Sequence, residues 1–178
     1  MSRQHLVAVD LQRVFADPDS GWYVPRFAEI VEPVQRLVAA FDPRVTFTRF
    51  VADPAPTGAW RAYYEQWPFA LVPADDPLYA LAEPFAGRAT LDATTFGKWG
   101  SRLAARLGSD DEIVLAGVST DCCVLSTALP AADAGIKVVV AADACAGATD
   151  TSHAQALDLM RLYGPLIEVQ TADRILSR

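Results

Sequence analysis

The stretch IVLAGVSTDCCVLSTA, residues 113–128, decides the fold that the sequence predicts. Residues 113–118 are an unbroken apolar run rich in β-branched side chains, which is typical of a strand buried on both faces of a parallel sheet. Ser119, Thr120 and Asp121 follow at once, and their side chains are of the types that accept hydrogen bonds from the free N–H groups of a helix start. The stretch therefore predicts a strand, a tight turn and a helix.

Two adjacent thiols, Cys122 and Cys123, lie where this helix begins. In an open α/β sheet the helix begins at the carboxyl end of the strand, which is where ligands bind. A helix N-terminus favours negative charge, so we expect the pKa of a cysteine here to fall below its usual value of about 8.5. The turn is therefore a candidate catalytic centre with a cysteine nucleophile.

Strands and helices alternate on both sides of this unit. Short apolar runs indicate further strands at residues 5–9, 45–50, 88–92, 136–140 and 166–170. Apolar side chains three and four positions apart indicate helices, a long one at residues 26–41 and shorter ones at residues 102–107 and 153–163. We predict a single α/β domain over residues 1–178, with a doubly wound, mostly parallel sheet of about six strands and helices on both faces.

Residues 52–88 interrupt this alternation. The segment is rich in Pro, Asp and Ala and carries many aromatic side chains, which indicates a long, partly helical excursion. Its rings either form the walls of a pocket or only cover a sheet edge or a subunit contact. As candidate substrate-binding residues we take Trp60 and Tyr64 from this segment and Phe15 from the loop after the first strand.

The composition excludes several classes of partner. The net charge is −7, with 15 Lys and Arg against 22 Asp and Glu, which argues against nucleic acid and against an anionic membrane surface. The apolar start of the chain, residues 6–9, is too short for a signal peptide, and no stretch approaches the roughly 20 apolar residues of a membrane span. Three cysteines, two of them adjacent, form no disulfide framework. We expect a cytoplasmic homo-oligomer, a dimer or a tetramer.

The sequence offers little for a cofactor or a metal. It has no GxGxxG after the first strand and no GxxxxGK[ST], so the usual signatures of nucleotide binding are missing. His5 and His153 are its only histidines, and we expect them to be surface or supporting residues rather than metal ligands. Cys145 is expected to be a small residue of a loop or of the core. We therefore expect no cofactor and no metal.

A cysteine nucleophile needs a proton acceptor and a group that holds developing charge. Asp10 directly follows the first strand, and Lys98 lies in the connection before the central strand. Because the carboxyl ends of parallel strands meet at one edge of the sheet, both side chains can reach Cys123 there. Taken singly, Asp10 could be a loop cap, Lys98 a surface lysine and the thiols buried filler.

Three motifs around these residues, in this order, resemble those of a known superfamily. VAVDLQ surrounds Asp10, TTFGKWGS surrounds Lys98 and GVSTDCCV surrounds Cys123. Together they resemble the isochorismatase-like cysteine hydrolases, the superfamily of nicotinamidases and N-carbamoylsarcosine amidases. The resemblance extends from residue 7 to about residue 167.

The resemblance implies a catalytic triad of Asp10, Lys98 and Cys123. It also implies a cis peptide bond between Val118 and Ser119. We expect the backbone N–H groups of Ser119 and Cys123 to form the oxyanion hole of this site.

The chain departs from some members of the superfamily. Nicotinamidases carry an Asp-x-His metal motif after the second strand, whereas residues 48–52 contain no histidine. Isochorismatases that cleave a vinyl ether commonly lack the cysteine, so Cys123 favours the amidases. We expect hydrolysis of a C–N bond in a small amide or N-carbamoyl substrate through a thioester. The alternatives are a vinyl-ether hydrolase in which Cys123 is a bystander, and a catalytically silent binding or assembly subunit.

Overall fold

The computed structural model describes residues 3–108 and 111–178. Its described strands form one open sheet in the order β3-β2-β1-β4-β5-β6, and every neighbouring pair is parallel. The strands are β1 (Arg3–Val9), β2 (Val45–Phe50), β3 (Thr90–Ala93), β4 (Asp111–Val118), β5 (Lys137–Ala146) and β6 (Ile167–Gln170). The predicted doubly wound sheet of about six strands is therefore confirmed.

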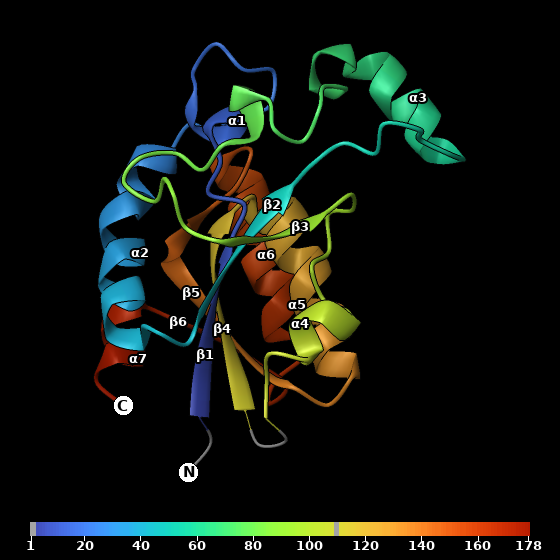
Figure 1. The fold of residues 1–178 in the computed structure, drawn as a ribbon. Helices are drawn as coiled ribbons and strands as arrows, with labels where there is room; N and C mark the ends of the chain where they lie inside the picture. Colours follow the sequence, from blue (N-terminus) through green and yellow to red (C-terminus); the bar gives the residue numbers. More distant parts are fainter. Residues whose placement is uncertain (1–2, 109–110) are drawn as a thin grey trace.

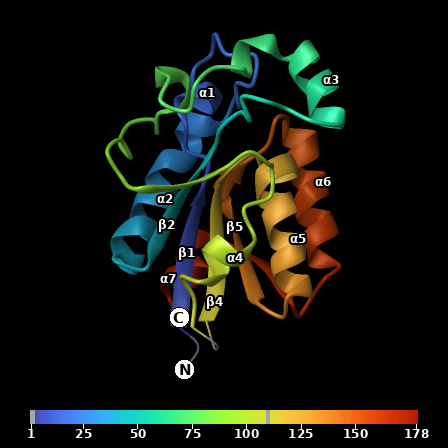
Figure 2. The same cartoon turned by 45° about the vertical axis from the view of Figure 1, so that its right-hand side comes forward.

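Helices cover both faces of the sheet (Figure 1 and Figure 2). One face carries α2 (Phe27–Phe41) and α7 (Ala172–Leu176), and the other carries α4 (Ser101–Ala104), α5 (Leu125–Asp133) and α6 (Asp150–Arg161). The long helix α2 buries one stripe of side chains at the predicted helical spacing, namely Phe27, Ile30, Val34, Leu37 and Val38. The middle of the sheet is therefore buried between two layers of helices, whereas the outer strands β3 and β6 stay partly exposed.

The central strand β4 is buried along its whole length. Its side chains alternate between the two apolar layers: Val114 and Ala116 pack toward α2, whereas Ile113 and Leu115 pack toward α5. A strand with two buried faces needs apolar residues at successive positions, which accounts for the unbroken run in the sequence.

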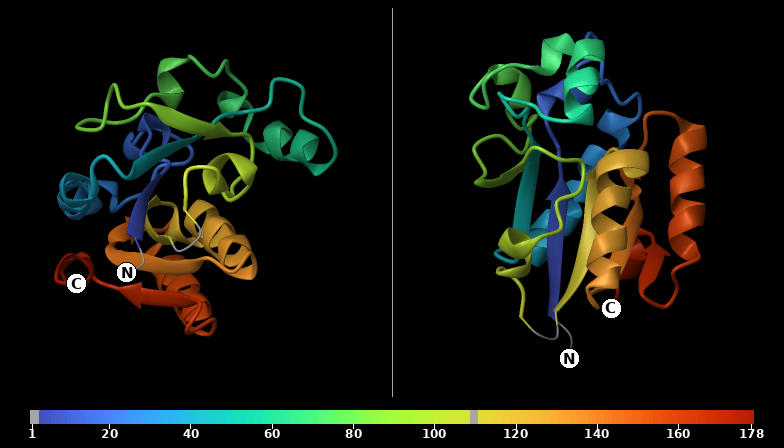
Figure 3. Two further views of the ribbon diagram at one scale, coloured as in Figure 1. Left: turned by 60° about the horizontal axis from the view of Figure 1, so that its bottom comes forward. Right: turned by 90° about the vertical axis from the view of Figure 1, so that its right-hand side faces the viewer.

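The switch point of the sheet, where the order of the strands reverses direction, lies between β1 and β4. From β1 the chain moves outward to β2 and β3, and from β4 it moves outward to β5 and β6, as Figure 3 shows in the view along the sheet. In open α/β sheets the crevice at the carboxyl ends of two such strands is where ligands bind. Residue 10 follows β1 and residue 119 follows β4, so both lie at this crevice.

The excursion of residues 52–88 is partly helical, as predicted. It contains α3 (Ala59–Gln66) and two 3-10 turns, Pro68–Ala70 and Pro77–Tyr79. Together with α1 (Arg13–Ala16), α3 lies beyond the carboxyl ends of the strands, at the top of Figure 1. The excursion therefore lies over the end of the sheet that carries the crevice.

The turn after β4 differs from the prediction in its hydrogen bonds. A π-helical turn, Thr120–Val124, precedes α5, and the Ser119 carbonyl accepts hydrogen bonds of 3.1 Å from the N–H groups of Cys122 and Val124. The Ser119 side chain does not cap the helix, and Asp121 Oδ1 accepts the N–H group of Ala148 at 2.9 Å. The expected side-chain cap is therefore wrong, because backbone groups close this turn and Asp121 bonds to the chain after β5.

Other segment ends also differ. β5 continues to Ala146, so Cys145 lies buried in a strand and belongs to the core. The helix expected at residues 102–107 is the single turn α4. The sequence pattern did not predict α1 and α7, because helices of four and five residues are too short to show a helical period. Among the helices of residues 3–108 and 111–178, none combines the length and apolar character that crossing a bilayer requires.

Candidate active site

Asp10 lies at the end of β1 in an unusual backbone conformation. Its φ angle is +50°, in the left-handed region that few residues other than glycine adopt, and its side chain is fully buried. Thr48 on β2 holds it in place, since the Thr48 hydroxyl donates to Asp10 Oδ1 at 2.7 Å and accepts the Asp10 N–H group at 3.2 Å. A left-handed, fully buried aspartate with its own hydrogen-bond partner is typical of a functional site.

A glycine allows β4 to approach this end of β1. Gly117 has a φ angle of +122°, and a Cβ atom at this position would lie only 2.1 Å from the carbonyl oxygen of Val9. No larger residue fits there without moving the backbone that leads into Asp10.

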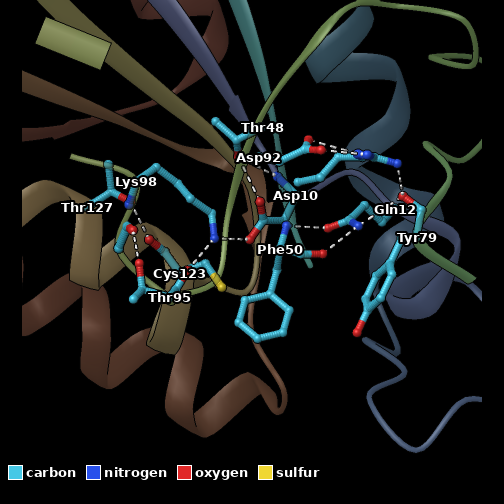
Figure 4. A network of polar contacts seen from close by, with 12 residues as sticks. Asp10, Gln12, Thr48, Phe50, Tyr79, Asp92, Thr95, Lys98, Cys123 and Thr127 are labelled. Atoms are coloured by element: carbon cyan, nitrogen blue, oxygen red, sulfur yellow. Dashed lines mark hydrogen bonds and ion pairs between the residues drawn. The ribbon is translucent and has the colours of Figure 1, made fainter. Parts of the chain in front are cut away.

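Lys98 forms a buried ion pair with Asp10 (Figure 4). Its Nζ lies 2.9 Å from Asp10 Oδ2, and neither side chain is exposed to solvent. The ammonium group also donates to the Thr95 carbonyl at 2.8 Å and lies 5.3 Å from the centre of the Phe50 ring. Lys98 is therefore part of the interior, and the alternative of a surface lysine is wrong.

The segment that carries Lys98 is fixed against α5. The Lys98 N–H group donates to Thr127 Oγ1 at 2.9 Å, and the same hydroxyl donates to the Cys123 carbonyl at 2.7 Å. Gly97 permits the close approach, because a Cβ atom there would lie 2.5 Å from the Ser126 carbonyl oxygen. Thr127 thus connects the backbones of two candidate triad residues.

Cys123 completes the group. Figure 4 shows its sulfur on the same side as the Lys98 ammonium group and the Asp10 carboxylate. Burial raises the pKa of the Cys123 thiol well above its usual range, the negative charge of Asp10 raises it further, and Lys98 opposes the increase. The pKa of Cys123 is therefore raised, contrary to the lowered pKa expected at the helix start, because burial is the largest influence on this thiol. The thiol is protonated beside a carboxylate that can accept its proton.

Cys123 also lines a cavity of about 340 Å³. Half of the residues that line it are aromatic: Phe15, Trp22, Tyr23, Phe50, Tyr63, Trp67 and Phe96. Ser119, Asp121, Cys122 and Cys123 supply its polar part, and Gly21, Val24 and Ala148 complete it. Asp10 and Lys98 do not line the cavity, so Cys123 lies between two environments, a buried charged pair and a largely apolar cavity.

The three candidate substrate-binding residues have different positions. Phe15 lines the cavity, whereas Trp60 and Tyr64 do not. These two rings stack on one face of α3, and Tyr64 is buried in an apolar cluster with Phe50, whose own ring lines the cavity. Tyr63, one position earlier on the helix, lines the cavity instead. Successive helical residues are rotated by about 100°, so a shift of one position changes which ring faces the chamber.

Gln12 is a supporting residue that the sequence analysis missed. It is fully buried, its Nε2 donates to the carbonyl groups of Phe50 and Tyr79 at 2.9 and 3.0 Å, and its Oε1 accepts the Phe50 N–H group at 2.8 Å. Gln12 therefore connects the loop after Asp10 to the end of β2 and to the excursion. The sequence gives one indication of this role, because Gln12 lies two residues after Asp10 in the motif VAVDLQ.

The two histidines have structural roles. His5 is buried, and its Nε2 lies 2.8 Å from Thr46 Oγ1, so of the two expected positions, surface or supporting, it has the supporting one. His153 Nδ1 lies 2.8 Å from Thr120 Oγ1 and supports the turn that carries the cysteines. Within residues 3–108 and 111–178, no group of three or more His, Cys, Asp or Glu side chains is arranged to hold a metal ion.

Comparison with known proteins identifies relatives of this fold and sequence. The profile of the family described as Isochorismatase domain matches residues 4–173. None of the curated proteins searched matches the sequence. The profile match confirms the resemblance that the three motifs indicated.

Solved structures share the fold at low sequence identity. A cysteine hydrolase from Pseudomonas syringae pv. phaseolicola superposes with a TM-score of 0.84 at 24% identity, covering 98% of this chain and 91% of its own. An isochorismatase family protein from Desulfovibrio vulgaris gives 0.80 at 22% identity and covers both chains completely, at 100% each. A nicotinamidase from Bacillus subtilis gives 0.75 at 20% identity, covering 94% of this chain and 98% of its own.

Proposed function

Since the chain belongs to the isochorismatase family, we propose that it is a cysteine-dependent hydrolase that cleaves the C–N bond of a small amide or N-carbamoyl compound. The family supports a hydrolase of this fold. The observation that carries the finer proposal is the fully buried pair of Lys98 and Asp10, 2.9 Å apart, beside a cysteine that faces the cavity. One structural neighbour is named a nicotinamidase, a name that denotes an amide hydrolase.

The first half of the reaction forms a thioester. Asp10 takes the proton of the Cys123 thiol, and the sulfur attacks the carbonyl carbon of the bound amide. The carbonyl oxygen becomes an oxyanion, which the backbone N–H groups of Ser119 and Cys123 stabilise. The C–N bond then breaks, and the leaving nitrogen takes the proton from Asp10 and departs as ammonia or an amine.

The second half removes the acyl group. Asp10, again a carboxylate, takes a proton from a water molecule, and the resulting hydroxide attacks the thioester carbonyl. The C–S bond breaks, the acid or carbamate product leaves, and Asp10 returns its proton to the sulfur. Lys98 balances the charge of Asp10 whenever the carboxylate is ionised, which a fully buried carboxylate requires.

The different partners of the two Asp10 carboxylate oxygens fit the role of Asp10 as proton acceptor. Oδ1 is occupied by the Thr48 hydroxyl, whereas Oδ2 is ion-paired with Lys98 and makes no well-directed hydrogen bond within the described residues. Oδ2 thus keeps a lone pair for the proton of Cys123. The raised pKa of that thiol favours a neutral S–H group that gives up its proton only as the sulfur attacks.

The experiment is a panel of small neutral amides and N-carbamoyl compounds, with ammonia release as the readout. We expect turnover by the unmodified protein in the presence of a metal chelator and none by Cys123→Ala. Cys122→Ala, which changes the adjacent thiol, is the matched control and should keep most of the activity. Hydrolysis of a vinyl ether that survives Cys123→Ala would favour the ether hydrolase, and the absence of any turnover or adduct would favour the silent subunit.

A further inference from the structure

The cavity that Cys123 lines has almost no charged side chains. Among the described residues that line it, Asp121 is the only one with a charged side chain, and the rest are aromatic, small, hydroxyl or thiol groups. Burial raises the pKa of the Cys122 thiol, so that thiol stays neutral near pH 7. The chamber therefore presents one negative charge to whatever enters it.

Two cations outside the lining form ion pairs elsewhere. Lys98 pairs with Asp10 and does not line the cavity. Arg26 lies in a second cavity, where it pairs with Glu29 at 2.5 Å and with Asp150 at 3.4 Å. A substrate carboxylate in the main cavity would therefore lose its hydration and find no cation in exchange, which is strongly unfavourable.

Asp121 keeps its charge available. Its Oδ1 accepts the Ala148 N–H group at 2.9 Å, which fixes the carboxylate at the rim, and it makes no ion pair with any described residue. Burial lowers the pKa of neighbouring His153, so that ring is neutral near pH 7 and does not offset the charge. The half-buried carboxylate therefore attracts a cation or a strong hydrogen-bond donor.

The aromatic wall favours the same kind of ligand. Trp22, Tyr63 and Phe96 belong to one connected group of rings, in which Tyr63 lies 5.9 Å from Trp22 and 5.6 Å from Phe96, centre to centre. Aromatic faces attract cations and apolar groups. The rings of Trp22 and Tyr63 also carry an N–H and an O–H donor, but these groups are neutral, so the wall offers a carboxylate no positive charge. The wall and Asp121 thus have the same charge preference.

We propose that this cavity selects apolar or aromatic amides that are neutral or positively charged, and that it rejects substrates with a carboxylate. The proposal rests on the hydrolase function proposed above, since it describes the substrate of that site. It excludes N-carbamoyl amino acids and other anionic amides, and leaves neutral carbamoyl compounds and amides with an amine or quaternary ammonium group.

Charged thiol reagents test the cavity without requiring turnover. Three methanethiosulfonates carry a trimethylammonioethyl, a methyl or a sulfonatoethyl group, and each reacts with a cysteine sulfur to form a mixed disulfide and release methanesulfinate. Labelling of Cys122 and Cys123 is located by peptide mass, and each rate is divided by the rate with a small neutral thiol. We expect the cationic reagent to react at least about tenfold faster than the anionic one.

Two matched variants test whether Asp121 causes the faster reaction of the cationic reagent. Asp121→Asn removes the charge and keeps an Oδ1 acceptor for Ala148, so it should reduce the ratio at least about threefold. Asp133→Asn changes the net charge equally at an exposed position at the end of α5, outside the lining, and should leave the ratio unchanged. Equal rates, a faster anionic reagent, an unchanged ratio in Asp121→Asn or no labelling by any reagent would each overturn the proposal.

Hydrolysis of three matched benzamides, with a 3-trimethylammonio group, no substituent or a 3-carboxylate, separates this proposal from the proposed function. Preferential hydrolysis of the carboxylate would overturn the charge selection and leave the hydrolase intact. Charge-selective labelling without hydrolysis of any amide would support the charge selection and count against the amidase.

Discussion

Replacing Lys98 with Met removes the one charged partner that the fully buried Asp10 carboxylate has within residues 3–108 and 111–178. The side chains of Lys98 and Asp10 are both 0% exposed, with Nζ and Oδ2 2.9 Å apart. Removing one member of a buried ion pair costs about 3–5 kcal/mol, because the other charge is left without compensation. The variant also loses the hydrogen bond to the Thr95 carbonyl and the ammonium contact with the Phe50 ring. We expect Lys98→Met to lose about 3–5 kcal/mol of unfolding free energy and about 10²-fold or more in turnover.

A double-mutant cycle measures this coupling. Urea unfolding followed by circular dichroism gives the free energy of unfolding for the unmodified protein, Lys98→Met, Asp10→Asn and the double variant. In the double variant no charge is buried, so its loss should be smaller than the sum of the two single losses. Single losses below about 1 kcal/mol, or losses that simply add, would refute the reasoning that this pair is buried and mutually dependent.

Three further predictions follow from individual contacts. Thr127→Val removes the hydroxyl that connects the Lys98 N–H group to the Cys123 carbonyl. We expect the free energy of unfolding to fall by about 1–3 kcal/mol and kcat to be reduced. The control Ser126→Ala, at the neighbouring position, should change neither quantity. Burial raises the pKa of Cys145 to about 12, so the unfolded chain ionises this thiol first and stability should fall as pH rises from about 9 toward 12, by up to about 1.4 kcal/mol per pH unit. Unfolding free energies of Cys145→Ala should decline less over this pH range, and an identical decline would contradict the assignment. Gly117→Ala should prevent or severely destabilise folding, since its Cβ atom would lie 2.1 Å from the Val9 carbonyl; a soluble variant with unchanged unfolding free energy would contradict the close approach of the two strands.

The fold was predictable because it follows from local patterns. An unbroken apolar run has few alternatives to a buried parallel strand, and β4 is buried throughout. The convergence of Asp10, Lys98 and Cys123 follows from the same rule, since residues at the carboxyl ends of parallel strands share one edge. The order of the strands also sets which two ends are adjacent.

The details of the site depend on tertiary packing and were not predictable in the same way. The sequence gives no sign of which of the neighbouring aromatic residues on α3 faces the cavity, so it cannot distinguish Tyr64 from Tyr63, which lines it. Thr127 has no catalytic motif of its own. Its bond to the Cys123 carbonyl is local, but the bond from the Lys98 N–H group joins residues 29 positions apart and depends on tertiary packing. Burial of Cys123, which raises its pKa, is likewise a property of the packed site.

The central claim is that Cys123, and not Cys122, forms the covalent intermediate. Both thiols line the cavity, but Cys123 is the one that lies next to Asp10 and Lys98. The most direct measurement is the intact mass of the protein after brief mixing with an electrophilic amide analogue, followed by mapping of the modified peptide. We expect one acyl group on Cys123, retained in Cys122→Ala and absent in Cys123→Ala. A single adduct on Cys122 that persists in Cys123→Ala would contradict the account.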